Sequence, residues 1–279
     1  MLASDVEDLI SRALAEDIGP RDITTEAVVD PGQRARARVV QKAPGIVYGL
    51  DVAEAVFHRL DPLVRIERRR PEGDWLTEPP ADVLALEGNA RGLVTAERVA
   101  LNLLGHLSGI ATATGACVYE LRGTGVKVLD TRKTIPALRS LERQAVAAGG
   151  GHNHRMGLFD AVLVKDNHIA LAGGIEEAVR RAIARRPQGM AVEVECSSLA
   201  DVEIALAAGA EHLLLDNMAP AQLREAATLV AGRAELEASG NITLQTLQSV
   251  GASGVQSVSL GFLTHSAPAL DLSMSVEPV

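Results

Sequence analysis

The stretch AVEVECSSLADVEIALAAGAEHLLLD, residues 191–216, contains two short apolar segments with a helix-like segment between them. AVEVE and HLLLD have the length and apolar content of buried strands, and LADVEIALAAG has the length of a helix. Strands that are apolar on both faces and separated by helices are typical of parallel sheets. The stretch therefore predicts a strand–helix–strand unit of a parallel sheet.

The same alternation extends through the second half of the chain. Six segments read as buried strands: VKVLD, AVLVK, AVEVE, HLLLD, AELEAS and SVSLG. Helix-like stretches separate them, such as IEEAVRRAIARR at 175–186 and PAQLREAATLVAG at 220–232. This order predicts an α/β barrel that is closed or nearly closed. Six strands are fewer than the eight of a complete barrel.

The first half has a different pattern. Short strand-like pieces at 34–41, 64–70 and 81–88 are separated by turn residues and one helical piece at 51–60. Ser4 with Glu7 reads as a capping box for an N-terminal helix. This half is expected to form a small α+β unit with an antiparallel sheet.

Polar and charged residues follow the barrel strands at the points where they end. The carboxyl ends of barrel strands meet at one rim, and active sites lie there. One charged residue at a strand end is usually a solvated cap, but a succession of them indicates a shared site. These residues are Arg132, Lys133, Lys165, Glu195, Asp216, Ser239, Gly240 and Gly261.

The charges of these residues indicate the kind of ligand. Residues 130–166 carry six cations and four acids within a chain of net charge −9. Glu195 and Asp216 suit a divalent cation or ribose hydroxyls, and Ser239-Gly240 can present backbone N–H groups to a phosphate. An anionic substrate, a phosphorylated sugar and Mg²⁺ would account for the set. The cations placed to bind carboxylate or phosphate oxygens are Arg132, Lys133, Arg155 and Lys165.

The stretch GGGHNHRMG, 149–157, places four polar residues directly after three glycines. His152 and His154 could form an HxH metal pair, as in a zinc hydrolase barrel. Such a site needs further histidines at later strand ends, whereas His212 begins its strand and so belongs to the opposite rim. No GxSxG, Walker A or GxGxxG motif follows a strand.

A helical region from about residue 93 carries a polar stripe, because Arg98, Asn102 and His106 are four residues apart. The pattern fits a water-facing stripe and a functional one equally well. Asn102, His106 and Ser108 also interrupt the longest apolar run, so no bilayer-spanning segment is expected.

Composition excludes several classes of partner. The net charge of −9 and an aromatic content of 2% argue against nucleic acid and anionic membrane surfaces. Cys117 and Cys196 make no disulfide framework, which fits a reducing compartment. The N-terminus, MLASDVEDLI, lacks the pattern of a signal peptide. A cytoplasmic protein is therefore expected.

Several motifs occur in a specific order between residues 95 and 266. They are TAERVALNLLGHLSGIAT, DTRKTIPALRSLERQAVAAGGGHNHRMGL, VLVKDNHI, EVEC, LLLDN, EASGNI and GFLTHS. This combination closely resembles the quinolinate phosphoribosyltransferases, the decarboxylating enzymes of NAD biosynthesis. The resemblance implies transfer of phosphoribosyl from phosphoribosyl pyrophosphate to quinolinate with loss of CO2, with Mg²⁺ as cofactor.

The resemblance also implies an α/β fold: an N-terminal α/β sandwich domain followed by an open (incomplete) α/β barrel. Such a barrel conventionally has seven strands, and the sequence shows six of them. On this chain we place the sandwich domain at 1–108 and the barrel at 109–267, with 268–279 as a tail that can return to the first domain. It further implies a homodimer or higher homo-oligomer in which each barrel mouth is covered by the partner. Arg98 would then reach the neighbouring subunit's site.

Site residues are carried over motif by motif. Quinolinate would meet Arg98, Arg132, His154, Arg155 and Lys165. Flexible glycines before His154 and Arg155 would let the backbone bring these two close to a small planar diacid. Glu195 and Asp216 would hold Mg²⁺, directly or through water, and would act with Lys133 as the catalytic residues. The phosphoribosyl pyrophosphate residues would be Lys133, Glu195, Asp216, Ser239, Gly240, Gly261 and His265.

Two positions depart from the family pattern. Ile135-Pro136-Ala137 stands where TPG or LPG is usual, and Asn241 replaces a frequent glycine beside the expected phosphate loop. One alternative is a related barrel associated with molybdate transport, which shares DTRKT-like motifs but lacks the HNHRMG and KDNHI pair. Another is a non-catalytic barrel that senses an anion, although Glu195 and Asp216 beside an anion argue against it.

Overall fold

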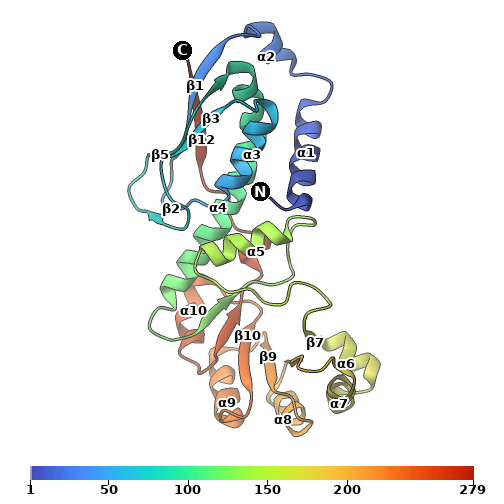
Figure 1. The fold of residues 1–279 in the computed structure, drawn as a ribbon. Helices are drawn as coiled ribbons and strands as arrows, with labels where there is room; N and C mark the ends of the chain where they lie inside the picture. The colour runs from blue at the N-terminus through green and yellow to red at the C-terminus, as the bar shows by residue number, and fades with distance from the viewer. Residues whose placement is uncertain (1) are drawn as a thin grey trace. The chain divides into compact units, whose positions relative to one another are not determined.

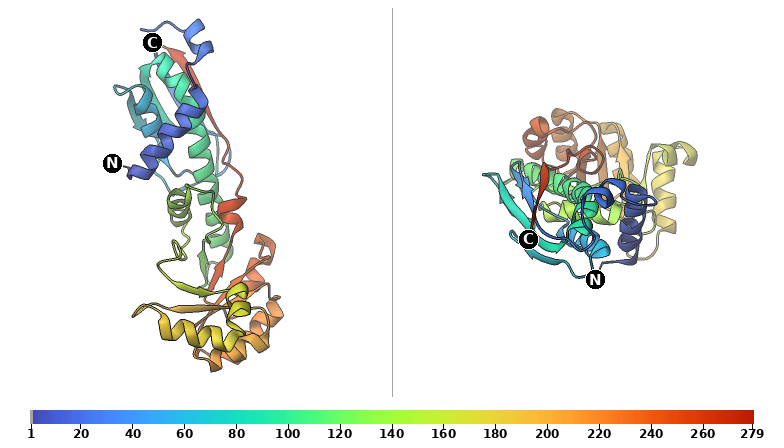
Figure 2. Two further views of the ribbon diagram at one scale, coloured as in Figure 1. Left: turned by 90° about the vertical axis from the view of Figure 1, so that its right-hand side faces the viewer. Right: turned by 90° about the horizontal axis from the view of Figure 1, so that it is seen from above.

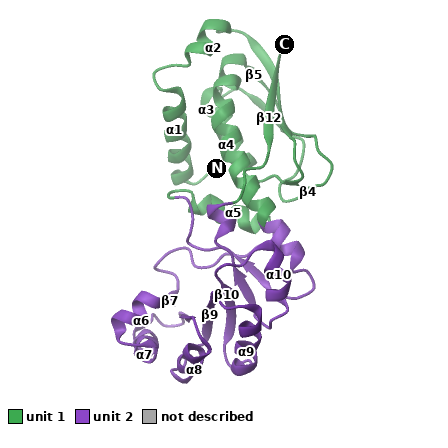
Figure 3. Ribbon diagram, turned by 180° about the vertical axis from the view of Figure 1, so that it is seen from behind, with its two compact units in different colours: residues 1–113, 136–149, 267–279 green, residues 114–135, 150–266 purple. Residues whose placement is uncertain are grey.

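The computed structural model describes residues 2–279 (Figure 1), which form two compact units (Figure 3). Unit 1 contains residues up to 113 together with 136–149 and 267–279, and unit 2 contains 114–135 and 150–266. The long helix α4, Ala90–Glu120, contributes residues to both units. The chain therefore does not divide at a single point.

Unit 1 is built on a four-stranded antiparallel sheet in the order β12-β1-β5-β3. The strands are β12 (Leu272–Pro278), β1 (Arg34–Gln41), β5 (Ala81–Asn89) and β3 (Arg65–Arg68). Along β1, exposed arginines alternate with buried Ala35, Ala37 and Val39, because successive side chains point to opposite faces. Helices α1 (Ser4–Ile18), α3 (Leu50–Leu60) and the first part of α4 lie on one side of the sheet (Figures 1 and 2).

Three short elements complete unit 1. Helix α2 spans Ile23–Val28, and strands β2 (Gly45–Ile46) and β4 (Trp75–Leu76) pair antiparallel. The C-terminal strand β12 runs beside β1, with Ala35 opposite Pro278 and Gln41 opposite Leu272 (Figure 2). The end of the chain thus completes a sheet that begins near its start.

The expected capping box at Ser4 and Glu7 is wrong. Helix α1 begins at Ser4 with Ala3 as its N-cap, and no side chain caps it. The Ala3 carbonyl accepts from the Val6 and Glu7 N–H groups at 3.0 and 3.2 Å. Because the helix starts one residue earlier than expected, Ser4 lies inside the first turn. The Glu7 carboxylate instead forms an ion pair with Arg59.

Unit 2 contains a six-stranded parallel sheet in the order β6-β11-β10-β9-β8-β7. Each of its strands corresponds to one of the six segments predicted from the sequence, and only β8 extends beyond its segment, by one residue at Cys196. They are β6 (Lys127–Leu129), β7 (Val162–Val164), β8 (Val192–Cys196), β9 (His212–Asp216), β10 (Glu235–Ser239) and β11 (Ser257–Ser259).

Helices connect these strands and lie outside the sheet, as the alternation of segments predicted (Figure 1). Helix α6 (Asp166–Ala172) and α7 (Ile175–Arg185) lead from β7 to β8, and α11 (Phe262–His265) follows β11. The helices after β8, β9 and β10 are α8 (Leu199–Ala207), α9 (Pro220–Val230) and α10 (Leu244–Gly251).

The segment after the three glycines takes the place of a seventh strand. His152 forms a single parallel bridge with Leu129 at the β6 edge of the sheet. Its N–H donates to the Val128 carbonyl at 2.8 Å, and its carbonyl accepts from the Asp130 N–H at 3.1 Å. Helix α5 (Arg139–Ala148) leads into this segment. A single bridge in a polar stretch produces no alternation of apolar and polar residues. The sequence therefore does not reveal this seventh position in the sheet.

Helix α4 is long and apolar enough, by length and composition, to cross a membrane, contrary to the expectation from its polar interruptions. In the structure, 56% of its most apolar window is buried, as in the core helix of a soluble domain. Gly105 and Gly109 face the returning segment 268–270, and the Leu270 N–H donates to the Gly105 carbonyl at 2.9 Å. A Cβ at Gly109 would collide with the Pro268 carbonyl, so this close packing requires glycine.

Candidate active site

A pocket of about 550 Å³ opens at the carboxyl ends of the unit 2 strands. Every site residue predicted from the sequence except Arg98 lines it. The rim expected of a parallel barrel is therefore present. The lining residues from the prediction are Arg132, Lys133, His154, Arg155, Lys165, Glu195, Asp216, Ser239, Gly240, Gly261 and His265.

Two neighbouring strands place a cation and an acid together at this rim. Lys165 follows β7, Glu195 lies near the end of β8, and their Nζ and Oε2 atoms are 3.1 Å apart. The Glu195 side chain is 15% exposed and that of Lys165 is 46% exposed. The pair lies partly in water, so a charged ligand can reach both groups.

A tight loop follows β10 beside the end of β9. Gly240 has φ +81°, and a Cβ there would collide with Asn217 Oδ1 and lie 3.0 Å from Asp216 Oδ1. Asn241 has φ +49° and donates from Nδ2 to Asn217 Oδ1 at 2.9 Å. Asparagine tolerates this left-handed conformation better than most residues. The departure at Asn241 therefore keeps the backbone shape that glycine would allow.

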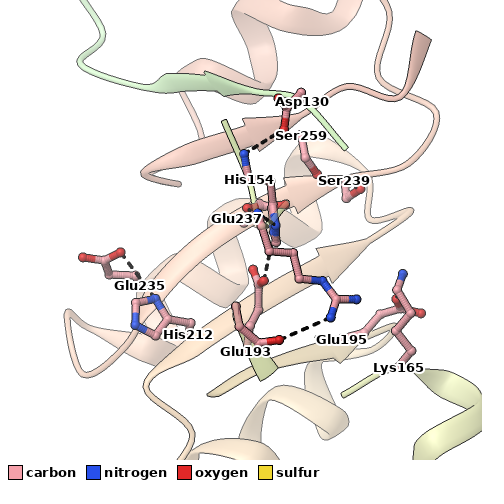
Figure 4. A network of polar contacts seen from close by, with 12 residues as sticks. Asp130, His154, Lys165, Glu193, Glu195, His212, Glu235, Glu237, Ser239 and Ser259 are labelled. Carbon is pink, nitrogen blue, oxygen red and sulfur yellow. Dashed lines mark hydrogen bonds and ion pairs between the residues drawn. The ribbon is translucent and has the colours of Figure 1, made fainter. Parts of the chain in front are cut away.

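The two glutamates nearest to His154 hold its ring. Its Nε2 lies 3.0 Å from Glu193 Oε2 and 3.6 Å from Glu237 Oε2 (Figure 4). Burial opposes charge on the ring, but the Glu193 hydrogen bond and the Glu237 charge outweigh it and raise the pKa of His154. Burial and the charge of Glu193 raise the pKa of Glu237 to about 7. His154 therefore faces carboxylates as well as the pocket.

Arg155 lies beside another cation of the pocket. Burial, followed by the charge of Arg132, lowers the pKa of Arg155. Its Nη1 donates to the Ala161 carbonyl at 3.3 Å. Neighbouring cations repel each other, so this arrangement favours a ligand with more than one negative charge.

Arg98 is the predicted residue that the structure does not place in this pocket. It lies on α4 in unit 1, its side chain is 63% exposed, and its Nη2 is 3.8 Å from Glu97 Oε1. Its stripe does not simply face water, because His106 Nε2 contacts the fully buried Glu142 at 2.8 Å. Asn102 is exposed.

Two family models cover nearly the whole chain. The N-terminal domain of quinolinate phosphoribosyl transferase matches residues 22–108, and the C-terminal domain matches residues 110–275. This chain belongs to the quinolinate phosphoribosyltransferase family.

Known relatives resemble this phosphoribosyltransferase over most of its length and most of their own. A probable carboxylating nicotinate-nucleotide pyrophosphorylase of Bacillus subtilis is 42% identical, covering 97% of this chain and 93% of the relative. A chloroplastic relative from Arabidopsis thaliana is 40% identical, with coverage of 98% and 83%. The crystal structure of NadC from Streptococcus pyogenes has a TM-score of 0.93 at 42% identity, covering 100% of this chain and 99% of that one.

These relatives do not favour the alternatives of a molybdate-associated or a purely anion-sensing barrel. The zinc hydrolase alternative lacks its ligands in the described part of the chain. His212 lies at the start of β9 with its Nδ1 3.4 Å from Glu235 Oε2, on the other rim. His152 is absent from the metal-type cluster found among residues 2–279, which consists of His154, Glu193 and Glu237.

Sequence reasoning missed Glu237, which lines the phosphoribosyltransferase pocket, and two further residues that contact His154. Glu193 lies inside β8 and Glu237 inside β10, each two residues before a predicted site residue, Glu195 and Ser239. Because strand side chains alternate, a residue two positions before a rim residue shares its face. An acidic residue two positions before a rim residue could therefore have been recognised from the sequence as part of the site. Asp130, which is fully buried and accepts from the His154 N–H at 2.7 Å, was also missed.

Proposed function

We propose that this protein transfers the phosphoribosyl group of phosphoribosyl pyrophosphate to the ring nitrogen of quinolinate. The products are nicotinate mononucleotide, pyrophosphate and CO2, and the reaction serves NAD biosynthesis. One observation carries the proposal: a single pocket combines a group of cations with two acids and a glycine loop at the strand ends. The pyrophosphorylase names of the relatives describe the same reaction in reverse.

The quinolinate half of the pocket consists of Arg132, His154, Arg155 and Lys165. Guanidinium and ammonium groups suit the two carboxylates of the substrate, because charged hydrogen bonds are about twice as strong as neutral ones. The repulsion between Arg132 and Arg155 is relieved when a dianion lies between them. Arg98 of the partner subunit completes this half in the proposed homodimer.

The phosphoribosyl half consists of Lys133, Glu195, Asp216, Ser239, Gly240, Gly261 and His265. Gly261 lies close to two of these side chains, because a Cβ there would be 3.0 Å from Lys133 Cδ and 3.2 Å from His265 Nε2. The Lys133 carbonyl accepts from Thr264 Oγ1 at 2.8 Å, which ties the loop after β6 to helix α11. Backbone and lysine thus meet where a phosphate would bind.

The acids of the pocket fit Mg²⁺. Mg²⁺ prefers oxygen ligands and is usually held by one or two carboxylates together with substrate phosphates. Glu195 and Asp216 supply two carboxylates at the ends of β8 and β9. When bound, Mg²⁺ would neutralise negative charge on the pyrophosphate.

The chemistry needs no side-chain nucleophile. The lone pair of the quinolinate nitrogen forms a bond to the anomeric carbon, and the electron pair of the breaking C–O bond leaves with pyrophosphate. Lys133 stabilises the departing oxygens. The C2–carboxylate bond of the resulting pyridinium then breaks, its electron pair stays at C2 beside the cationic nitrogen, and a proton replaces CO2. Positioning and electrostatics account for most of the catalysis.

We place the protein in the cytoplasm, although relatives from Arabidopsis and tobacco are named chloroplastic and mitochondrial. Cys117 and Cys196 are free and buried. Burial raises the pKa of both thiols to about 12. These protonated thiols suit a reducing compartment.

The activity itself is tested by substrate choice. Purified protein with quinolinate, phosphoribosyl pyrophosphate and Mg²⁺ should release both pyrophosphate and CO2, and chelation should stop the reaction. Nicotinate should be a very poor substitute, because each lost charged hydrogen bond costs about 1.5–3 kcal/mol. Assays of pyrophosphate and of labelled CO2 measure both products. Comparable turnover of the two acids would refute the assignment.

Gly240→Ala should weaken phosphoribosyl pyrophosphate binding roughly tenfold or more, because the new methyl group must displace Asn217 and Asp216. Quinolinate binding should change little. Gly232→Ala is the matched control, since Gly232 has φ +76° but nothing within 4 Å of its added Cβ. Calorimetric titration of both ligands measures the effect. Equal losses in the two variants would mean that backbone strain alone is responsible.

A further inference from the structure

We propose that Glu193 and Glu237 are positioning residues, which hold His154 and through it Arg155 in place for the two carboxylates of quinolinate. The inference rests on the proposed assignment of His154 and Arg155 to quinolinate. Neither glutamate needs to touch a substrate for this role. Glu237 acts through the imidazole ring, and Glu193 acts through the ring and also through its charge on Arg155.

The two carboxylates reach one ring nitrogen from separate strands. Glu193 lies on β8 and Glu237 on β10, with β9 between them. Their Oε2 atoms are 3.0 and 3.6 Å from His154 Nε2, and Figure 4 shows the ring between them. The side chains of Glu193 and His154 are 15% and 14% exposed. Water therefore competes only weakly for these contacts.

Burial makes the position of Glu237 costly. The residue is 6% exposed, and its Oε1 has no hydrogen-bond partner among residues 2–279. A buried polar atom without a partner opposes folding. The contact of its other oxygen with His154 offsets part of this cost. A carboxylate kept at such a place for stability alone would be better replaced by an apolar side chain.

The segment that carries His154 has little other support from the sheet. It follows three glycines and is joined to β6 by the single bridge at His152. A normal strand would be held by a ladder of backbone hydrogen bonds. Side-chain contacts replace that ladder here: Asp130 Oδ1 accepts from the His154 N–H, and the glutamates hold the ring.

Packing also leaves His154 and Arg155 open on two sides. They line the pocket at the carboxyl ends and a second hollow of about 390 Å³. His154 Nδ1 accepts from the Arg155 N–H at 2.6 Å, so ring orientation and the Arg155 backbone are linked. Rotation of the ring would break the hydrogen bond between His154 Nδ1 and the Arg155 backbone N–H. Polar contacts, more than apolar packing, therefore set the position of this pair.

The sign of the effect separates positioning from simple electrostatics. Two carboxylates near a dianion repel it, so their removal would tighten quinolinate binding if charge were their only influence. Loss of positioning would weaken binding instead. The structure therefore predicts that removal of either glutamate weakens quinolinate binding, whereas the loss of negative charge alone would strengthen it.

The test compares Glu193→Ala and Glu237→Ala with the corresponding glutamine variants in the full-length protein. Alanine should raise the KM for quinolinate by roughly tenfold or more and change the KM for phosphoribosyl pyrophosphate less than about twofold. Glutamine keeps an oxygen acceptor for the ring and should restore most of the affinity. Glu235→Ala is the matched control, because exposed Glu235 on β10 pairs with His212 on the neighbouring β9, apart from the cluster (Figure 4).

A second readout keeps the test valid if an alanine variant folds poorly. The His154 Nε2–H resonance should exchange slowly with solvent in the wild-type protein and faster in the glutamine variants, whose acceptor is neutral and weaker. The inference is overturned if wild-type protein is active while the variants bind quinolinate unchanged or more tightly. It is also overturned if both KM values rise together. Wild-type protein inactive on quinolinate would instead contradict the proposed function.

Discussion

Mixing two inactive variants, Arg98→Ala and Glu195→Ala, is expected to restore up to about a quarter of wild-type activity when subunits exchange. Arg98 does not line its own chain's pocket, whereas Glu195 does. In the proposed homodimer, each site combines the barrel of one chain with Arg98 of the other. A heterodimer of the two variants therefore has one site with both changes and one with neither.

The expected value follows from random pairing. Half of the dimers are heterodimers and each has one intact site of two, which gives about a quarter of full activity. Arg98→Ala alone should nearly abolish activity and leave the fold intact, since the side chain is exposed and fills no core volume. Activity assays before and after exchange, with exchange verified by mass-tagged subunits, provide the measurement.

A pair of changes within the same barrel serves as the control. Glu195→Ala mixed with Asp216→Ala should remain inactive, because both residues belong to one chain's pocket and every site keeps one change. If the Arg98→Ala mixture also remains inactive despite proven exchange, Arg98 acts within its own chain or only structurally. Recovery in both mixtures would contradict the assignment of Glu195 and Asp216 to one site.

Arg155→Ala and Asp216→Ala should have opposite effects on the two substrates. Arg155 lies beside Arg132 in the quinolinate half, so its loss should weaken quinolinate binding roughly tenfold or more and change phosphoribosyl pyrophosphate binding little. Asp216 adjoins the Gly240 loop, so its loss should weaken phosphoribosyl pyrophosphate binding and raise the Mg²⁺ concentration required.

Calorimetry with each substrate, across a series of Mg²⁺ concentrations, measures this division. Arg180→Ala is a suitable control, because Arg180 is 69% exposed on α7 and pairs with Glu177 outside the pocket. It should leave both affinities unchanged. Equal loss of both ligands in both pocket variants would show that the pocket does not divide into the two proposed halves.

The sequence by itself determined the class of fold and most of the pocket. Strand segments such as AVEVE and HLLLD are apolar and separated by helices, a local pattern that is typical of a parallel sheet. The carboxyl ends of parallel strands must share one rim, so Glu195 and Asp216 could be placed together without coordinates. The charge pattern added Arg155, and the resemblance added His154 and His265, which no strand-end argument reaches.

Other features were decided only by the tertiary structure. His152 pairs through one bridge, and Glu193 and Glu237 meet at His154 from strands that are not neighbours. Such contacts depend on the curvature and register of the sheet, which join residues far apart in sequence and leave no local period. The helix start at Ser4, with Ala3 as its N-cap, and the return of β12 to β1 were settled in the same way, by backbone hydrogen bonds available only in the folded chain.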